Sequence, residues 1–139
     1  MSFNRNGKPF FAQGRLKVGE MNRGERAYAA HLERMKEVGQ ILWWKFEGLK
    51  LRLADNTFYT PDFAVLAADG VMECHEVKGF WQDDARVKIK VAADLYPFRF
   101  KAMKPEAQKR GGGYIVENFS DPAPKPEELP ASAPLFEAT

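Results

Sequence analysis

The sequence predicts an α/β fold, in which a central mixed β-sheet is flanked by helices. Three observations predict it: a capped amphipathic helix, a run of three strand-like segments, and a second helix followed by another strand. This order is typical of a sheet that carries helices on its faces. With 139 residues, the chain suits one compact domain with a substantial core.

The first helix is expected to begin near Asn22 and to end near Gly39. Asn22 and Glu25, three positions apart, have the form of a capping box, in which each side chain binds the other residue's backbone N–H. Apolar residues follow at helical spacing: Tyr28, Leu32 and Met35. Gly39 is a typical helix stop, because glycine readily adopts the conformation that ends a helix.

Strand-like sequence begins after this helix. Residues 41–53 indicate one long strand or a broken one, since Gly48 interrupts the β-rich pattern. Asp55-Asn56 supplies a turn into a second strand, expected from Thr57 to Leu66 with Pro61 inside it. A proline within a strand indicates an edge or an irregularity, where side chains are often presented to a site.

The second half of the chain is expected to complete the sheet. Asp69-Gly70 predicts a hairpin turn into a third strand from Val71 to Lys78. A helix should then run from Asp83 or Asp84 to about Tyr96. Its expected buried stripe is spaced by four residues: Val87, Val91 and Leu95. A strand at 98–103, a helical turn at 105–110 and a short strand at 114–116 follow.

The two ends of the chain differ from the middle in charge and composition. Residues 1–21 read as a basic arm, and residues 1–26 hold six basic and two acidic residues, a net +4. Residues 117–139 hold one basic and five acidic residues, a net −4. Residues 120–139 are rich in proline and acid and are expected to be a disordered tail. A basic arm opposite an acidic tail favours contact with nucleic acid. The folded domain is therefore expected at 22–119.

Several classes of protein are disfavoured by composition. The single cysteine, Cys74, excludes an intramolecular disulfide framework and a multi-cysteine zinc site. No signal peptide is evident, and no apolar run approaches the roughly 20 residues that span a bilayer. A cytoplasmic protein without a membrane partner is the expectation.

Three charged residues carry the chemistry that the sequence suggests: Asp62, Glu76 and Lys78. Residues two apart in a strand project from the same face, so Glu76 and Lys78 should point together, and the hairpin should bring Asp62 beside them. Two carboxylates with room for water and phosphate suit Mg²⁺. Such an ion lowers the pKa of bound water and stabilises charge on phosphate. Lys78 would position or deprotonate that water, or neutralise developing charge.

The plainer alternative is a cross-strand salt bridge, which contributes little to stability at a surface. Apolar neighbours argue for burial instead, where an unpaired carboxylate is costly: Phe63, Val65, Cys74 and Val77. His75 alternates away from Glu76 and is expected to be structural or exposed rather than a general base.

The motif also resembles a known family. Pro61-Asp62, a spacer of 13 residues and Glu76-Val77-Lys78 resemble the signature of the PD-(D/E)XK nucleases. The longer pattern, 57–63 with 76–81 and then Asp83-Asp84, Arg86 and Lys88, resembles the phage endonuclease I family of junction-resolving enzymes, over residues 22–103. That resemblance implies a restriction-endonuclease-like core and metal-dependent hydrolysis of branched DNA, such as Holliday junctions, in phage recombination or replication.

The resemblance also implies roles for individual residues. Asp62 and Glu76 would bind Mg²⁺, for which Mn²⁺ would substitute, with the backbone carbonyl of Val77 as a further ligand. Lys78 would be the catalytic lysine, and Glu25 would match the acidic residue that the family takes from its first helix. The alternative for Glu25 is a capping role alone, which suffices to explain it.

Basic residues outside this motif are candidates for DNA contact. By helical angle Lys88 should lie with Val91 and Leu95, nearer the sheet and the site, and it ranks above its neighbours. Arg86 and Lys90 are one turn apart and like-charged, so DNA phosphates would supply their counter-charge, unless they form a solvated basic face. Basic residues near the N-terminus complete the set: Arg15, Lys17 and Arg23.

Junction resolution needs two symmetric cuts, so a homodimer with two-fold symmetry is expected. The family's dimer is intertwined, and a long strand from Leu42 to Leu53 would take the bridging role. Residues 133–136 weakly resemble peptides that dock on replication proteins. The alternatives are a less selective nickase or DNA-degrading nuclease, and a non-catalytic DNA-binding accessory protein on a nuclease fold.

Overall fold

The structure, a computed structural model, describes residues 19–79 and 83–120. Its helices are α1 (Arg23–Glu37) and α2 (Asp83–Leu95), with a 3₁₀ turn, η2, at Gln108–Arg110. Its strands are β1 (Ile41–Phe46), β2 (Leu51–Ala54), β3 (Thr57–Tyr59), β4 (Phe63–Ala67), β5 (Met72–Val77), β6 (Arg99–Pro105) and β7 (Tyr114–Asn118). The basic arm at 1–18, with Arg15 and Lys17, and the acidic tail at 121–139 lie outside the described residues.

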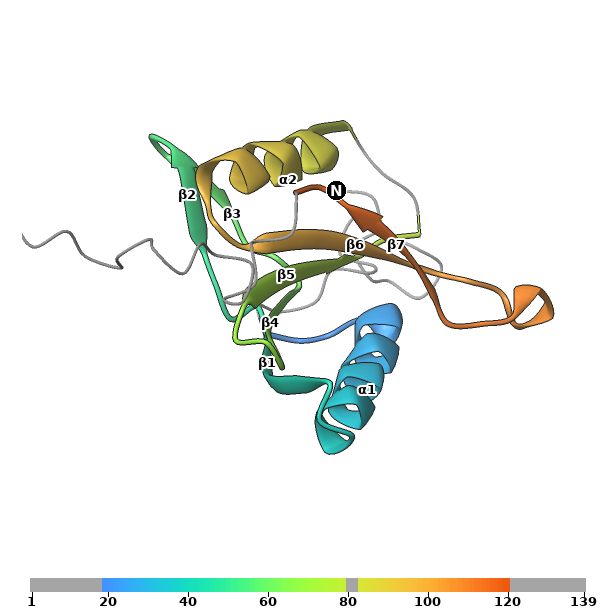
Figure 1. The fold of residues 1–139 in the computed structure, drawn as a ribbon. Coiled ribbons are helices and arrows are strands. Elements are labelled where there is room, and N and C mark those ends of the chain that lie inside the picture. Colours follow the sequence, from blue (N-terminus) through green and yellow to red (C-terminus); the bar gives the residue numbers. More distant parts are fainter. Residues whose placement is uncertain (1–18, 80–82, 121–139) are drawn as a thin grey trace, which may run out of the picture.

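A five-stranded sheet in the order β1-β4-β5-β6-β7 forms the centre, and β2 and β3 pair in a separate small sheet. Only β5 and β6 run parallel within the described sheet, because the connection between them passes through α2. Figure 1 shows α1 on one face of the sheet and α2 on the other. The expected α/β fold with a mixed sheet flanked by helices is confirmed.

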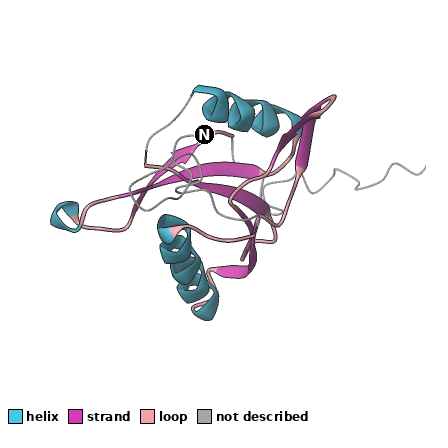
Figure 2. Ribbon diagram, turned by 180° about the vertical axis from the view of Figure 1, so that it is seen from behind, coloured by secondary structure: helices cyan, strands magenta, loops and turns pink. Residues whose placement is uncertain are grey.

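Strand alternation divides the core between the two faces. One cluster of buried residues packs under α1: Tyr28, Ala29, Leu32, Ile41, Phe63, Val65 and Met103. The second lies under α2 and includes the small sheet: Leu51, Tyr59, Cys74, Ile89, Ala92 and Phe100. Figure 2 shows the small sheet beside α2, at one end of the main sheet.

The first helix forms as expected. The Asn22 side chain accepts from the Glu25 backbone N–H at 2.8 Å, and the Glu25 carboxylate accepts from the Asn22 N–H at 2.8 Å, so the capping box is complete. Gly39 follows the helix with a φ of +80°, the left-handed conformation that favours glycine.

The segment at 41–53 is broken, and its halves belong to different sheets. Glu47 adopts a φ of +49°, and Gly48 then passes close to β4. A Cβ at Gly48 would lie 3.0 Å from the Cβ of Lys45 and 3.2 Å from the Cβ of Ala64, so glycine is required there for space. The prediction of a single bridging strand from Leu42 to Leu53 is therefore wrong.

The expected strand from Thr57 to Leu66 is also wrong. It is divided into β3 and β4, and residues 60–62 belong to neither. Pro61 lacks the N–H that a ladder needs and fixes its own φ, so the chain changes sheets at this point. As a result Asp62 lies in the short link that enters β4 instead of inside a strand.

In α2 the predicted buried stripe is wrong. Val87, Val91 and Leu95 are 57%, 39% and 52% exposed. The buried residues are Ile89 and Ala92, with Ala93 and Tyr96 packed partly beside them. Both sets have helical spacing, and the helix turns Ile89 and Ala92 toward the sheets, where they pack in one cluster with Leu51, Tyr59, Cys74 and Phe100.

The remaining elements follow the prediction. Asp69 and Gly70 turn β4 into β5 as an antiparallel hairpin, with Gly70 at a φ of +86°. The strand predicted at 98–103 is β6, the helical turn contains η2, and the short last strand is β7. Within the part of the chain that the structure describes, no helix is long and apolar enough to cross a membrane.

Candidate active site

Asp62 and Glu76 lie side by side at one end of the sheet. Phe63 pairs with His75 across the β4–β5 ladder, which places the preceding Asp62 opposite Glu76 on the same face. The Asp62 backbone N–H donates to Glu76 Oε1 at 3.2 Å, and Asp62 Oδ2 accepts from the Val77 N–H at 2.9 Å. The Asp62 carbonyl accepts from the Glu47 N–H at 2.8 Å. Asp62 is thus held through both its backbone and its carboxylate.

Glu76 is 5% exposed and is oriented by a residue from the small sheet. The Tyr59 hydroxyl donates to Glu76 Oε1 at 2.7 Å. Burial and the negative charge of Glu76 raise the pKa of Tyr59, so its hydroxyl stays protonated and remains a donor. The Tyr59 hydroxyl and the Asp62 N–H both donate to Oε1 of Glu76, whereas Oε2 faces Lys78.

Lys78 leaves β5 on the same face as Glu76, as the strand alternation predicts. Its Nζ lies 3.7 Å from Glu76 Oε2, and its side chain is 37% exposed. The Lys78 backbone N–H donates to the Met103 carbonyl on β6 at 3.1 Å, which fixes the chain where β5 ends. Lys78 is therefore anchored through its backbone, and its side chain is partly exposed to solvent.

Glu25 reaches the same place from the first turn of α1. The pKa of its half-buried carboxyl group is raised, chiefly by burial and further by the neighbouring Asp62. The hydrogen bond from the Asn22 backbone and the charge of Lys78 oppose this shift. These interactions place Glu25 near Asp62 and Lys78 while it also completes the capping box. The capping reading and the site reading of Glu25 are compatible.

The site carries an excess of negative charge. Burial raises the pKa of Asp62 to about 7, and the charge of Glu76 adds to the effect, whereas the Val77 N–H and Lys78 oppose it. Three carboxylates thus converge around a single lysine. A cation bound between them would relieve this repulsion.

The donors suit a magnesium ion in type. Within residues 19–79 and 83–120, no group of three or more His, Cys, Asp or Glu side chains is arranged as a ready-made metal cage. Mg²⁺ rarely uses such a cage; one or two carboxylates hold it, and water and substrate phosphates complete its shell. Asp62 and Glu76 are two such carboxylates, and they lie side by side.

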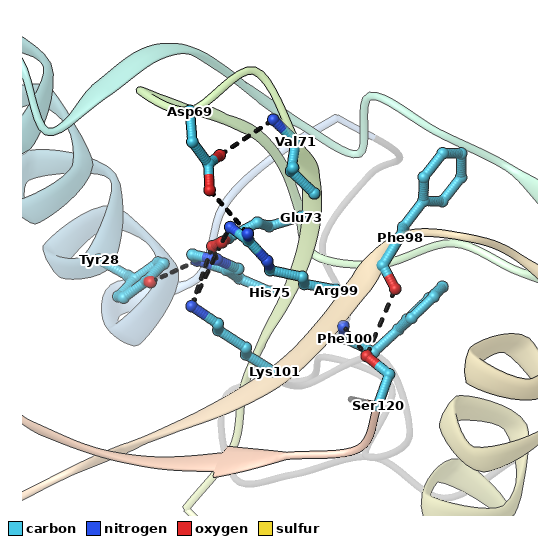
Figure 3. Close-up of polar contacts among 10 residues, drawn as sticks. All are labelled: Tyr28, Asp69, Val71, Glu73, His75, Phe98, Arg99, Phe100, Lys101 and Ser120. Carbon is cyan, nitrogen blue, oxygen red and sulfur yellow. Dashed lines mark hydrogen bonds and ion pairs between the residues drawn. The ribbon is translucent and has the colours of Figure 1, made fainter. Parts of the chain in front are cut away.

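The opposite face of β5 carries a second polar network, centred on Glu73 (Figure 3). Glu73 Oε1 contacts His75 Nε2 at 2.8 Å, and Glu73 Oε2 accepts from Arg99 at 3.0 Å and from Lys101 at 3.3 Å. Burial lowers the pKa of His75 despite the carboxylate beside it. A neutral ring that donates from Nε2 to Glu73 accepts at Nδ1 from the Tyr28 hydroxyl, 2.6 Å away. His75 is therefore buried and structural, not a base of the site.

The candidate DNA contacts fall into three groups. Arg86 is paired with Glu117 on β7, so the prediction that it needs DNA as its counter-charge is wrong. Lys88 and Lys90 are exposed, and Lys88 lies on the solvent side of α2 with Val91, so the expectation that it faces the sheet is also wrong. Arg23 is exposed at the start of α1, close in sequence to Glu25.

Two residues near the site gained no role from the sequence. Tyr59 orients Glu76, and Tyr28 links α1 to β5 through His75. Tyr59 stands three residues before Asp62 in the motif, which is the signal that could have identified it. Tyr28 reads as an ordinary apolar member of a helix face, and only the neighbouring β5 reveals its hydroxyl partner.

The chain matches no protein-family model, and comparisons with curated proteins and with solved structures find no match either.

Proposed function

We propose that the chain is a metal-dependent phosphodiester hydrolase with a PD-(D/E)XK site on a restriction-endonuclease-like core. Within that class, we propose an endodeoxyribonuclease that cuts branched DNA such as a four-way junction. The proposal is supported by one observation above others: Glu25 from α1, Asp62 from the link before β4, and Glu76 and Lys78 from the end of β5 converge, and burial together with the charge of Glu76 raises the pKa of Asp62.

The residues have distinct roles in this proposal. Asp62, Glu76, Glu25 and the backbone carbonyl of Val77 would hold Mg²⁺, or Mn²⁺ in its place. When bound, such an ion would supply a water of lowered pKa and offset charge on the phosphate. The Lys78 ammonium group would orient the attacking water or neutralise the developing negative charge. Tyr59 would keep Glu76 in a single orientation.

The branched substrate rests on the resemblance of the extended motif, and hydrolysis rests on the site. Two symmetric cuts in a junction require two sites, so we propose a two-fold homodimer that acts in the cytoplasm. Because the 41–53 segment is broken at Gly48, that dimer would not be bridged by one continuous strand.

The test uses the full chain with labelled four-way junction, nicked duplex and linear duplex, each with Mg²⁺ or with EDTA. Wild type should cut the junction fastest and only with metal. Lys78→Ala should lose at least about 100-fold in rate. Lys36→Ala, which removes an equivalent charge at the far end of α1, should cut like wild type.

Each alternative has its own outcome. No cutting of any substrate in any metal would overturn the enzyme, and junction binding unaffected by Asp62→Ala would then favour the DNA-binding accessory protein. Equal cutting of all three substrates would remove the junction preference and leave a less selective nuclease.

A further inference from the structure

The β6–β7 hairpin extends beyond the body of the domain from the end of the sheet that holds the candidate site. Val77 pairs with Met103, so β6 passes directly beside the end of β5 and then continues past it. Residues 104–113 form this extension, called here the β6–β7 arm. Figures 1 and 2 show it from opposite sides, standing away from both helices with the η2 turn at its tip.

The arm is a continuous ladder with an ordered tip. Pro105 pairs with Tyr114, and the Glu106 N–H donates to the Gly113 carbonyl at 2.9 Å. At the tip, the Arg110 and Gly112 N–H groups both donate to the Ala107 carbonyl. The base is held against α1, because the Tyr114 ring meets Tyr28 edge-on at 4.9 Å. Such a ladder keeps its tip at a defined distance from the site.

The charge of the arm is positive and unpaired. Lys104, Lys109 and Arg110 are all exposed, against the single acid Glu106. Within the described residues, no ion pair joins any of the three to a carboxylate. Gly111, Gly112 and Gly113 follow, all with positive φ, and a Cβ on Gly111 or Gly113 would meet nothing within 4 Å. The tip is thus open to close approach by another molecule.

The spacing fits double-stranded DNA. Met103 and Ala107 are four residue steps apart, a reach of about 13 Å for extended chain at a rise of roughly 3.3 Å per residue. That is close to the width of the major groove, about 12 Å, which separates phosphates on the two sides of a groove. A duplex with one phosphate at the site therefore brings others to the tip, because its backbone is rigid on this scale.

We propose that the β6–β7 arm is a duplex-DNA clamp, in which Lys104, Lys109 and Arg110 bind backbone phosphates about one groove width from the phosphate at the candidate site. This inference rests on the proposed function, since it takes DNA as the substrate. It adds a binding surface separate from α2 and from the N-terminal residues, and it predicts phosphate contact without recognition of base sequence.

The test measures DNA affinity of the full chain by fluorescence anisotropy, with Ca²⁺ to prevent cutting, over a series of salt concentrations. Lys109→Ala/Arg110→Ala should bind a linear duplex about 10-fold more weakly, and its slope of log affinity against log salt should fall by about 1–2, close to 0.9 per lost phosphate contact. The same variant should lose less affinity for a single strand of equal length, since a single strand can bend to reach the site without the arm.

A matched control removes two charges at the opposite end of the sheet. Lys36 lies near the end of α1, close in sequence to Ile41, which pairs with Ala67 at the end of the sheet away from the site. Arg52 lies near the start of β6, because its carbonyl accepts a hydrogen bond from the Tyr96 hydroxyl. Lys36→Ala/Arg52→Ala should keep the affinity and the salt slope of wild type. A second arm variant, Lys109→Gln/Arg110→Gln, keeps the side-chain bulk and guards against damage to the tip.

The outcomes separate this inference from the proposed function. If the protein cuts DNA but the arm variants bind like wild type, or lose no more than the control, the clamp is overturned while the nuclease stands. If nothing is cut in any metal but the arm variants lose duplex affinity, the clamp stands and the nuclease fails. Equal losses of affinity for duplex and for single-stranded DNA in the arm variants would also overturn the clamp.

Discussion

The Tyr28 hydroxyl on α1 donates to His75 Nδ1 on β5 across 2.6 Å, in a buried contact that joins the two elements of the candidate site. Tyr28 follows Glu25 by nearly one helical turn, and His75 directly precedes Glu76. The bond therefore fixes the start of α1, and with it Glu25, relative to the carboxylate on β5.

Tyr28→Phe tests this link. The variant leaves a buried ring nitrogen without its donor, which should lower the free energy of unfolding by about 1–3 kcal/mol. Urea denaturation measures it. Tyr114→Phe is the control, because no hydrogen bond of the Tyr114 hydroxyl is seen among the described residues, and it should change stability by less than about 0.5 kcal/mol. Equal effects of the two variants would contradict the link.

Tyr59→Phe should impair the site more than the fold. Glu76 keeps its charge but loses the donor that orients Oε1, so the metal concentration for half-maximal cutting should rise by about 10-fold. A metal titration of the cutting rate measures this. An unchanged titration, with normal thermal stability, would show that Tyr59 does not orient the carboxylate.

Asp62 should make the metal-free protein less stable as the pH rises. The folded-state pKa is raised from 3.8 to about 7, so the proton is bound more tightly in the folded state, and stability present below pH 3.8 is lost as the pH rises to 7. Asp62→Asn should abolish cutting and raise the free energy of unfolding at pH 8 by about 1–3 kcal/mol. A variant less stable than wild type at pH 8, measured in EDTA, would contradict this.

Glu73 should make the protein more stable as the pH rises, the opposite of the effect of Asp62. Burial alone would raise the pKa of Glu73, but His75, Arg99 and Lys101 together lower it from 4.5 to about 2. Its stabilising effect is therefore complete above pH 4.5 and is lost as the pH falls toward 2. Unfolding measured across this range should show a steeper loss for wild type than for Glu73→Gln. Parallel curves would rule out the Glu73 contribution.

Gly48→Ala should destabilise the protein through crowding. The added Cβ would lie 3.0 Å from Lys45 Cβ and 3.2 Å from Ala64 Cβ, which forces the link between the two sheets to shift. A loss of about 1–3 kcal/mol in the free energy of unfolding is expected. Gly24→Ala, inside α1 with 3.5 Å of clearance, should instead stabilise by about 0.5–1 kcal/mol. The same sign for both variants would refute the crowding argument.

Local signals in the sequence determined α1, the β4–β5 hairpin and the meeting of three charges. The Asn22–Glu25 capping box and the Asp69-Gly70 turn act over three or four residues, so their geometry is available without the fold. The pairing of Glu76 with Lys78 follows from strand alternation alone. The adjacency of Asp62 needed only the hairpin, whose register the turn fixes.

Only the tertiary structure decided which surfaces meet. α2 carries two apolar faces at helical spacing, and packing against the small sheet and the central sheet buries Ile89 and Ala92 while Val87 and Val91 stay exposed. Pro61 indicated an irregularity in the sequence. Only the fold shows that the chain passes there from the small sheet to the central sheet. Tyr59, Tyr28 and the β6–β7 arm owe their positions to partners distant in sequence. Long-range packing, which no local pattern encodes, brought the two tyrosines to the site and set the base of the arm beside β5.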